Sequence, residues 1–207
     1  IARTVREWHS GRRLAVRSPR AREKLTDLVP QLLVTFSRVF DPDGAVAAFD
    51  KALDRMIAAS ELFAILSANA ALRSLLGDIL GSAPRLAAAV TLRPHLLDGV
   101  IDSARDLCLD ADLMETRAAD VVSRCRTTEE CLDAIRAFQH EEHFLLGTAL
   151  LAGDLDPDAA GGAYAAPAVG LLRAVLRPLS TVFAAEHAVV ARAPVPTLPP
   201  RSPLSPQ

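Results

Sequence analysis

Two histidines and two glutamates lie side by side in the stretch AFQHEEHFLLG, at His140-Glu141-Glu142-His143. One class of zinc hydrolase places two histidines four apart on a helix, with a glutamate between them. The histidines here are three apart, which still shares one helix face. A zinc ion would need a third protein ligand. Because Phe138, Phe144 and Leu146 must face the core, we favour a solvated polar face, with a metal site as the alternative.

A second candidate is the pair Asp154 and Asp156 in the segment GDLDPD. Nucleotidyltransferases of the polymerase-β type hold two Mg²⁺ ions on such an Asp-x-Asp pair, on a strand that follows a Gly-Ser turn. Here the pair follows Gly153, a helix stop, and precedes Pro157, and no apolar run around it predicts a strand. We therefore interpret both aspartates as caps of the following helix, with metal catalysis as the alternative.

A third candidate is a basic cluster within GRRLAVRSPRAREK. Its members are Arg12, Arg13, Arg17, Arg20, Arg22 and Lys24. Such a cluster can bind phosphates or RNA, but no aromatic residue lies among them to stack on a base. The formal net charge of the chain, −2, does not favour nucleic acid either. We favour solvated or salt-bridged arginines, with RNA binding as the alternative, and interpret Trp8 as a packing anchor.

Machinery for nucleophilic catalysis is not visible in the sequence. There is no GxSxG turn, no Walker loop and no glycine-rich dinucleotide turn. The three cysteines, Cys108, Cys125 and Cys131, form no CxxC pair and are expected to be free thiols in a reducing cytoplasm. We expect no catalytic, cofactor-binding or metal-binding residue in this chain.

Helices must position all of these residues, because apolar side chains recur at spacings of three and four along most of the chain. Half of the residues are hydrophobic but only 4% are aromatic, a composition typical of close-packed helices. Prolines 19, 42, 84 and 94 lie where helices should begin, with Ser18 and Asp41 as caps. Pro30 should kink its helix. Later helices are predicted over 113–124, from about Thr127 to Leu151, and over 158–188.

The predicted fold is all-α, with two consecutive bundles of short and medium antiparallel helices. Six prolines between Arg192 and Gln207 predict a disordered or polyproline tail over residues 189–207. No signal peptide is recognised, and no apolar run is expected to be long enough to span a bilayer. Because the first residue is Ile1 and not methionine, we expect the chain to be a fragment or a processed form.

Three stretches of the sequence closely resemble one protein family. They are Arg6–Leu33, Phe49–Asp102 and Ala134–Ala166, and the segment Leu62–Asp98, with Asn69, Ala83-Pro84-Arg85-Leu86 and Arg93-Pro94, is the most specific. The chain is similar to the central helical region of bifunctional glutamine synthetase adenylyltransferase/adenylyl-removing enzymes. In that family one half attaches AMP from ATP to a tyrosine of glutamine synthetase, and the other half removes it by phosphorolysis.

The resemblance implies that residues 1–57 are trailing helices of the adenylyl-removing half. Residues 58–188 would then lead into the adenylyltransferase half. It also implies a cytoplasmic protein whose partners are the flanking nucleotidyltransferase domains, glutamine synthetase and a PII protein, with neither membrane nor nucleic acid. Mg²⁺ and ATP would be bound by domains outside this chain.

One departure from the family concerns the last residues. After Ala188 the family continues into its first catalytic strand, whereas this chain reads VVARAPVPTLPPRSPLSPQ. This predicts a truncated or frameshifted form that lacks the nucleotidyltransferase motifs and is not catalytic alone. A free-standing helical interaction module, with Pro196-Thr197-Leu198-Pro199 as a PxxP ligand, is the alternative.

Overall fold

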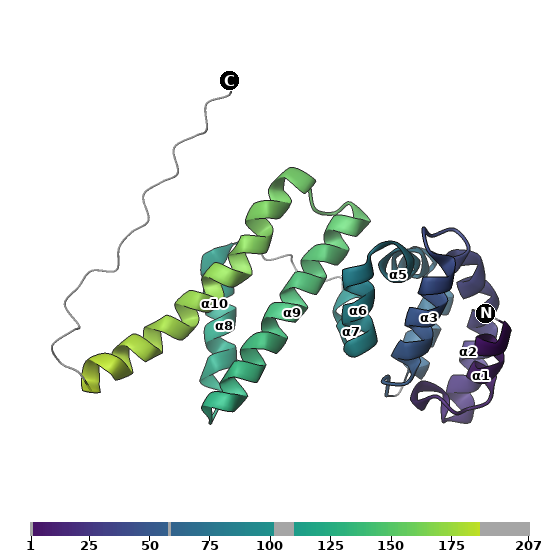
Figure 1. The fold of residues 1–207 in the computed structure, drawn as a ribbon, viewed down its shortest axis with the longest axis horizontal. Coiled ribbons are helices and arrows are strands. Elements are labelled where there is room, and N and C mark those ends of the chain that lie inside the picture. Colours follow the sequence, from purple (N-terminus) through teal and green to yellow (C-terminus); the bar gives the residue numbers. More distant parts are fainter. Residues whose placement is uncertain (1, 58, 102–109, 187–207) are drawn as a thin grey trace, which may run out of the picture.

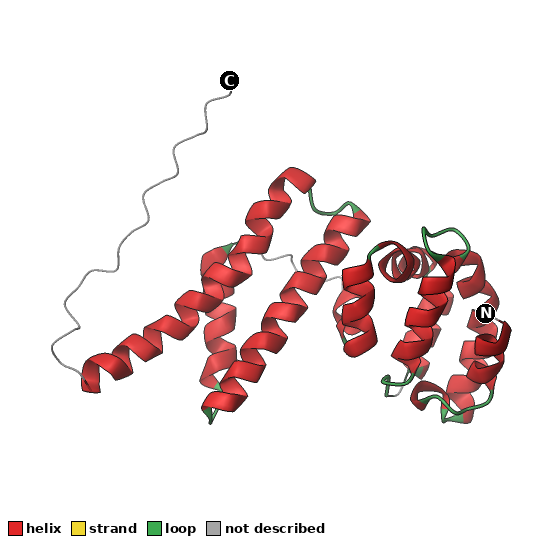
Figure 2. Ribbon diagram, in the orientation of Figure 1, coloured by secondary structure: helices red, strands yellow, loops and turns green. Residues whose placement is uncertain are grey.

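The computed structural model describes residues 2–57, 59–101 and 110–186, and these residues form ten α-helices, one 3-10 helix and no strand (Figure 2). The all-α prediction is confirmed for this part of the chain. The tail over 189–207, His187 and Cys108 lie outside the described residues. The elements in order (Figure 1) are α1 (Ala2–His9), η1 (Leu14–Val16), α2 (Pro19–Phe36), α3 (Pro42–Leu53), α4 (Ser60–Ala68), α5 (Ala70–Ser82), α6 (Pro84–Leu92), α7 (Leu96–Ile101), α8 (Ala111–Ser123), α9 (Thr128–Ala152) and α10 (Pro157–Glu186).

Helix starts follow the local sequence closely. Pro19, Pro42 and Pro84 each open a helix, where the missing N–H of proline has no intrahelical partner to lose. Ser18 Oγ accepts a hydrogen bond from the Ala21 N–H at 3.1 Å, and Asp41 Oδ1 accepts one from the Gly44 N–H at 2.9 Å. Both predicted N-caps are therefore confirmed.

The two longest helices end and begin at the short segment between Ala152 and Pro157. Gly153 adopts the left-handed conformation, with φ of +83°, and so ends α9 as the sequence predicts. Asp156 Oδ1 then accepts a hydrogen bond from the Asp158 N–H at 2.8 Å, at the start of α10. That helix continues without a break past Gly161, Gly162 and Pro167.

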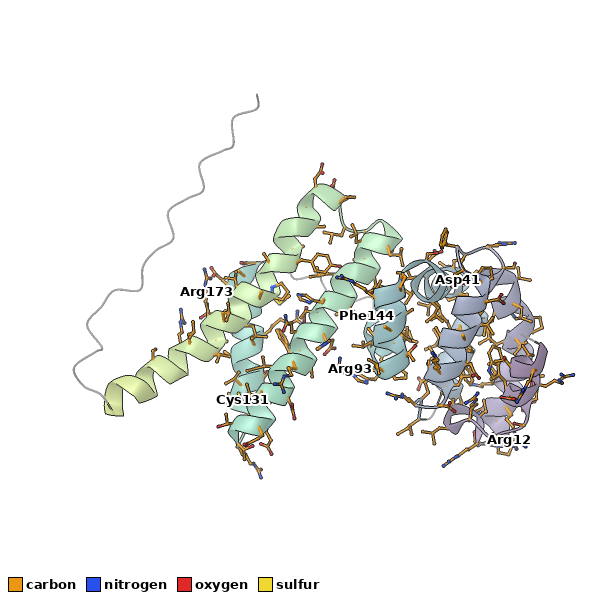
Figure 3. All side chains as sticks on the ribbon, in the orientation of Figure 1. Arg12, Asp41, Arg93, Cys131, Phe144 and Arg173 are labelled. Atoms are coloured by element: carbon orange, nitrogen blue, oxygen red, sulfur yellow. The ribbon has the colours of Figure 1, made fainter. Side chains whose placement is uncertain are left out.

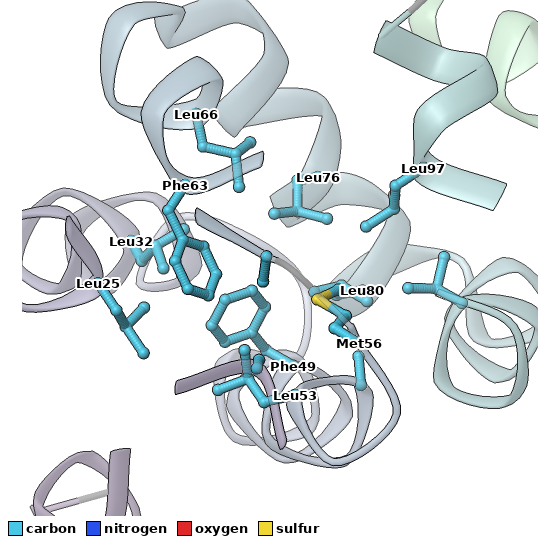
Figure 4. Packing of buried hydrophobic residues seen from close by; sticks show 14 of the residues in the cluster. Leu25, Leu32, Phe49, Leu53, Met56, Phe63, Leu66, Leu76, Leu80 and Leu97 are labelled. Carbon is cyan, nitrogen blue, oxygen red and sulfur yellow. The ribbon is translucent and has the colours of Figure 1, made fainter. Parts of the chain in front are cut away.

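One large hydrophobic core holds α1 to α7 together. Its centre is an aromatic group in which the Phe49 ring lies edge-on to Trp8 at 5.3 Å and to Phe36 at 5.9 Å between centroids. Leucines from α2, α3, α4, α5 and α7, together with Met56 from the connection after α3, surround this group (Figure 4). The core contains Phe49 and Phe63, which lie on opposite sides of residue 57. The assignment of residues 1–57 and 58–188 to different halves of a longer enzyme stays a prediction.

Helices α8, α9 and α10 pack against one another in the other part of the molecule (Figure 1). Met114, Ala118, Phe138, Ala166 and Ala174 form one small cluster between all three helices. A second cluster, between α9 and α10, consists of Leu146, Ala149, Leu155, Ala160 and Ala163. Helix α9 also contacts α5, α6 and α7, and its Phe144 is a buried member of the large core. Helix α9 therefore belongs to both groups of helices.

Helix α10 corrects one expectation from the sequence. Its stretch Pro157–Arg177 is long and apolar enough to cross a membrane by length and composition, with a mean hydropathy of 1.3, so the expectation that no run could do so is wrong by this criterion. A third of that stretch is buried inside the protein, and core helices often have the same composition. Ala163, Ala166 and Ala174 pack on α8 and α9 here.

Candidate functional site

The His-Glu-Glu-His stretch lies in the middle of α9, where its four side chains differ in exposure. His140 is exposed, His143 and Glu141 are half-buried, and Glu142 is buried with 4% of its surface accessible. The prediction of a solvated polar face is therefore wrong for Glu142. Among the described residues, no group of three or more His, Cys, Asp or Glu side chains is arranged to hold a metal ion.

Glu142 is buried because it forms an ion pair with Arg117 of α8. Arg117 Nη2 lies 2.5 Å from Glu142 Oε1, and Arg117 Nη1 donates to Glu142 Oε2 at 3.3 Å. The guanidinium also lies over the Phe138 ring, 5.9 Å from its centroid. A bidentate pair of this kind fixes the direction of both side chains, because the guanidinium plane matches the two carboxylate oxygens. The pair thus joins α8 to α9 beside their shared hydrophobic cluster.

The two histidines make separate local contacts. His140 Nδ1 donates to the carbonyl oxygen of Arg136 at 2.5 Å, one turn earlier in α9. The His143 ring packs on Tyr164 of α10, with 5.7 Å between ring centroids. Burial raises the pKa of Tyr164, so its hydroxyl stays protonated through the neutral range. Both histidines act here as helix-surface and packing residues.

Replacing Glu142 with leucine is expected to lower the free energy of unfolding by about 2 kcal/mol, because the guanidinium of Arg117 loses its carboxylate partner in a half-buried position. Adding Arg117→Met should recover most of that loss, since two apolar side chains of similar volume often replace a buried ion pair without cost. Urea unfolding followed by circular dichroism measures both variants.

The exposed pair Arg136–Asp133 provides the matched control. Its side chains are 63% and 79% exposed, so Asp133→Asn should change the stability by about 0.5 kcal/mol or less. The loss of stability in the double variant should be smaller than the sum of the losses in the two single variants. If it equalled that sum, Glu142 and Arg117 would not behave as a pair.

The two aspartates of the GDLDPD segment do different things. Asp156 caps α10, as the sequence predicts. Asp154 is exposed and makes no side-chain hydrogen bond or ion pair with another described residue, so the capping interpretation fails for it. It lies instead at the edge of an open hollow of about 490 Å³, also lined by Asp78 and Asn69. This position, in a loop between two helices, differs from the strand that a nucleotidyltransferase Asp-x-Asp pair requires.

The basic cluster of residues 12–24 divides into paired and exposed members. Arg13 Nη2 lies 2.6 Å from Asp50 Oδ2, and its Nη1 pairs with Asp54. Lys24 Nζ donates to the Ser60 carbonyl oxygen at 3.2 Å. Arg12 (labelled in Figure 3), Arg17 and Arg20 are exposed and form no ion pair with another described residue. The salt-bridge interpretation therefore holds for Arg13, and solvation describes these three arginines.

Trp8 anchors this basic segment to the core. The side chain is fully buried, and its Nε1–H donates to Asp50 Oδ1 at 2.8 Å. Asp50 therefore accepts hydrogen bonds from both Trp8 and Arg13. The interpretation of Trp8 as a packing anchor is confirmed.

Sequence reasoning missed the Arg117–Glu142 pair, although one local signal was available. Phe138, Glu142 and Leu146 are spaced by four, so they lie on the same helix face, and two of the three are apolar. The spacing alone places Glu142 toward the core. No signal identifies Arg117, because it is 25 residues away in the sequence and on another helix.

Two further open hollows lie on the surface. Arg173 and Arg177 of α10 pair with Asp112 and Glu115 of α8, and these four residues line an open hollow of about 500 Å³. Another open hollow, of about 680 Å³, is lined by both apolar residues and Arg55, Glu61, His95 and Asp98. Among the residues that line these two hollows, no nucleophile lies beside a base.

Comparison with known proteins places this arrangement in context. Residues 73–194 match the family model described as glutamate-ammonia ligase adenylyltransferase. The curated protein of Mesorhizobium japonicum described as bifunctional glutamine synthetase adenylyltransferase/adenylyl-removing enzyme is 41% identical over 192 residues, which are 92% of this chain and 20% of that protein. The protein of the same name from Agrobacterium fabrum is 38% identical over 190 residues, 90% of this chain and 19% of its own length. No solved structure matches.

The coverage is uneven in an informative way. The matches extend over nearly all of this chain, yet the chain spans only about a fifth of the length of these curated relatives. The relative from Brucella suis, which has the same name, gives the same picture, with 39% identity over 79% of this chain and 17% of the relative.

Proposed function

This chain belongs to the glutamate-ammonia ligase adenylyltransferase family, and from that membership we propose that it is the helical connecting segment of a bifunctional enzyme that adenylylates and deadenylylates glutamine synthetase. Its role is to hold two nucleotidyl-transfer centres at a fixed separation. One observation carries the proposal. The matches cover about nine-tenths of this chain but only a fifth of each relative, and the matched segment is built of packed helices.

A spacer must be stiff, and the contacts of this chain supply stiffness in two places. The large core joins helices on both sides of residue 57, and α3 packs directly on α5. Helix α9 then joins that core to α8 and α10 through Phe144. A helix of 30 residues such as α10 is about 45 Å long, enough to cross a small domain.

The proposal assigns the chemistry to parts of the longer protein outside this chain. Residues 1–57 form trailing helices of the adenylyl-removing half, residues 58–188 lead into the adenylyltransferase half, and together they form two consecutive bundles. The flanking nucleotidyltransferase domains bind Mg²⁺ and ATP, and the complete cytoplasmic enzyme acts on glutamine synthetase and responds to a PII protein. The packed faces of this segment could relay effector binding between the two centres, if they have two discrete arrangements.

A chimera tests the spacer role. In the Mesorhizobium japonicum protein, the matched 192 residues would be replaced by the corresponding residues of this chain. We expect the chimera to transfer AMP to glutamine synthetase and to remove it. Effectors should change the rates of transfer and removal in opposite directions, as in the parent enzyme. A second version would carry a flexible Gly/Ser linker of the same length, which does not fix the separation of the two ends.

The linker version is expected to lose the opposite response, because its two centres are no longer held in one arrangement. If it kept both rates and their effector response, the spacer role would be wrong. Purified alone, this 207-residue chain should incorporate no AMP into glutamine synthetase from Mg²⁺-ATP. AMP transfer by the isolated chain would contradict the assignment of catalysis to flanking domains.

A further inference from the structure

Two open hollows meet beside the large core and form a single groove. The hollow of about 680 Å³ and the hollow of about 490 Å³ are both lined by Ile65 of α4 and Ile101 of α7. Ile57 and Leu62 extend the apolar floor in the larger hollow, and Leu151 of α9 extends it in the smaller one. These five residues define the floor of what we call the α4–α7 groove.

The floor of this groove is supported from behind and accessible from outside. Leu66 and Leu97 of the large core line a small cavity together with Leu62 and Ile101, so buried leucines lie directly behind the floor (Figure 4). Ile57, by contrast, is 83% exposed. Covering exposed apolar surface contributes about 25 cal/mol for each Å² removed from water. The groove therefore offers a partner a firm apolar surface.

Carboxylates flank the floor in both hollows. Glu61 and Asp98 line the larger hollow, and Asp78 and Asp154 line the smaller one. None of these four side chains forms an ion pair or a side-chain hydrogen bond with another described residue. Glu61 and Asp98 lie in the first turns of α4 and α7, where the helix dipole favours an acid. Asp78 lies within α5 and Asp154 in a loop, so helix stability does not account for the two acids of the smaller hollow.

The cations of the groove leave part of this negative charge uncompensated. Arg55 and His95 line the larger hollow, and the described residues that line the smaller one include no cation. Arg55 Nη1 donates to the Leu92 carbonyl oxygen at 3.4 Å, and Arg55 forms no ion pair with another described residue. Even with His95 charged, four carboxylates outnumber two cations. The groove therefore attracts positively charged groups.

An amphipathic helix fits this surface better than a small molecule does. Small-molecule sites bury most of their ligand, whereas both hollows of the groove are open. A helix presents apolar side chains at spacings of three and four, and only that face has to be covered. An apolar floor flanked by acids thus matches a helix whose apolar face is bordered by lysine or arginine.

We propose that the α4–α7 groove docks a basic amphipathic helix supplied by a part of the longer protein outside this chain. The source of the helix rests on the proposed function, since this chain spans only about a fifth of the matched relatives. A helix tethered in the same polypeptide has a high effective concentration, so an open groove is sufficient to hold it. Docking in this way fixes a flanking domain against the large core.

A synthetic peptide tests the chemistry of the groove on the isolated 207-residue chain. The probe is a fluorescein-labelled helical peptide with leucines on one face and lysine and alanine elsewhere, and fluorescence anisotropy measures its binding. Two further peptides carry glutamate in place of lysine or alanine in place of leucine. Each should bind more weakly by roughly tenfold or more. Equal binding of the glutamate peptide would overturn the proposal.

Charge reversal in the groove shows where the peptide binds. Asp78→Lys combined with Asp154→Lys should weaken binding by roughly tenfold or more. The matched control, Asp27→Lys combined with Asp133→Lys, makes the same change of charge at exposed positions outside the groove. It should weaken binding by about twofold or less, because these charges act only at long range. Equal losses in the two variants would mean nonspecific attraction and would also overturn the proposal.

Ile57→Ser tests the apolar floor without disturbing the fold, because this side chain is already exposed. The variant should weaken binding of the lysine peptide by about fivefold, since part of the covered apolar surface is lost. Phe40→Ser is the matched control, since Phe40 is 91% exposed and does not line the groove. It should leave binding unchanged. Circular dichroism verifies that all variants are folded, and a loss as large in Phe40→Ser as in Ile57→Ser would contradict docking in the groove.

The chimera with the Mesorhizobium japonicum protein identifies the source of the helix. A photoreactive p-benzoylphenylalanine would replace Ile57, and mass spectrometry would locate the cross-link. We expect a cross-link within one polypeptide, to a lysine- or arginine-rich helix outside the exchanged 192 residues. No cross-link, or cross-links only to the exchanged residues, to a second copy or to glutamine synthetase, would contradict the proposal. This measurement needs no AMP transfer, so it tests docking even where the spacer role fails.

Discussion

Replacing Phe144 with alanine is expected to lower the free energy of unfolding by about 4 kcal/mol, the usual cost of removing a fully buried phenylalanine ring. The side chain is 2% exposed and lies in the large core formed otherwise by residues 8–97 (Figure 3). It is the buried side chain that α9 contributes to that core, with Leu151 partly buried beside it. Alanine at this position leaves a cavity between α9 and the helices α5, α6 and α7.

The free energy lost in Phe144→Ala should come from the contact between the two groups of helices. Helices α8, α9 and α10 keep their own clusters around Met114 and Leu146, and α1 to α7 keep the aromatic group around Phe49. Once the Phe144 contact is removed, each group retains most of its own buried surface. We therefore expect the two groups to unfold in separate steps in the variant, and in one step in the unchanged chain.

The chain contains one natural probe for each group. Trp8, the only tryptophan, lies in the large core, and Tyr164, the only tyrosine, lies in α10. Urea unfolding followed by tryptophan fluorescence and by tyrosine absorbance should give coincident transitions for the unchanged chain. For Phe144→Ala the two transitions should separate, which shows that one side chain couples the two groups.

Phe138→Ala is the matched control on the same helix. This phenylalanine belongs to the small cluster with Met114 and Ala166 and does not reach the large core. Its replacement should cost about 3 kcal/mol, since the side chain is 8% exposed, and should lower the midpoints of the tyrosine and tryptophan transitions together, because the Phe144 contact is intact. Coincident transitions in Phe144→Ala would instead mean that other contacts of α9, such as the close approach of Gly147 to Leu86, are sufficient for coupling.

Local chemistry explains why so much of the helical fold could be predicted. Caps such as Ser18, Asp41 and Thr127 act on N–H groups three residues away, and Gly153 ends α9 through its own φ angle. These signals lie entirely within a short window of sequence. Apolar spacing, which gives the buried face of each helix, is equally local.

Long-range pairing explains what could not be predicted. Asp50 looks like an ordinary helix-surface acid, yet it is bonded by Trp8 and Arg13, which lie 42 and 37 residues earlier. The sequence predicts a solvated Glu142, because the neighbouring phenylalanines and leucine are expected to take the core side, whereas its partner Arg117 is on another helix. Which helix packs on which depends on the fold as a whole, and a single sequence contains no direct record of it.

The same limit applies to the site. Arg117 meets Glu142 only because α8 packs on α9, and no spacing within either helix predicts that contact. By contrast, the position of Asp156 at a helix start follows from Pro157 beside it. The sequence predicts caps whose partners are near in the chain, and it does not identify the specific partner that a side chain finds on another helix.

Gly170→Ala is expected to lower the free energy of unfolding by about 3 kcal/mol, because α10 crosses α8 there with no room for a side chain. A Cβ atom at residue 170 would lie 2.5 Å from the Glu115 backbone nitrogen and 2.6 Å from Met114 Cβ. Most of these atoms belong to the α8 backbone and cannot rotate away, so the two helices must move apart. The movement would also stretch the ion pairs of Arg173 and Arg177 with α8.

Gly162→Ala makes the same chemical change earlier in α10, where no atom lies within 4 Å of the added Cβ. Alanine favours the helix over glycine by about 1 kcal/mol, so this variant should be stabilised by that amount or slightly less. The two variants should therefore shift the urea midpoint in opposite directions. Because both gain the same helical propensity, their difference measures the steric cost at the α8–α10 crossing alone. A Gly170→Ala chain as stable as Gly162→Ala would show that the two backbones do not meet at this point.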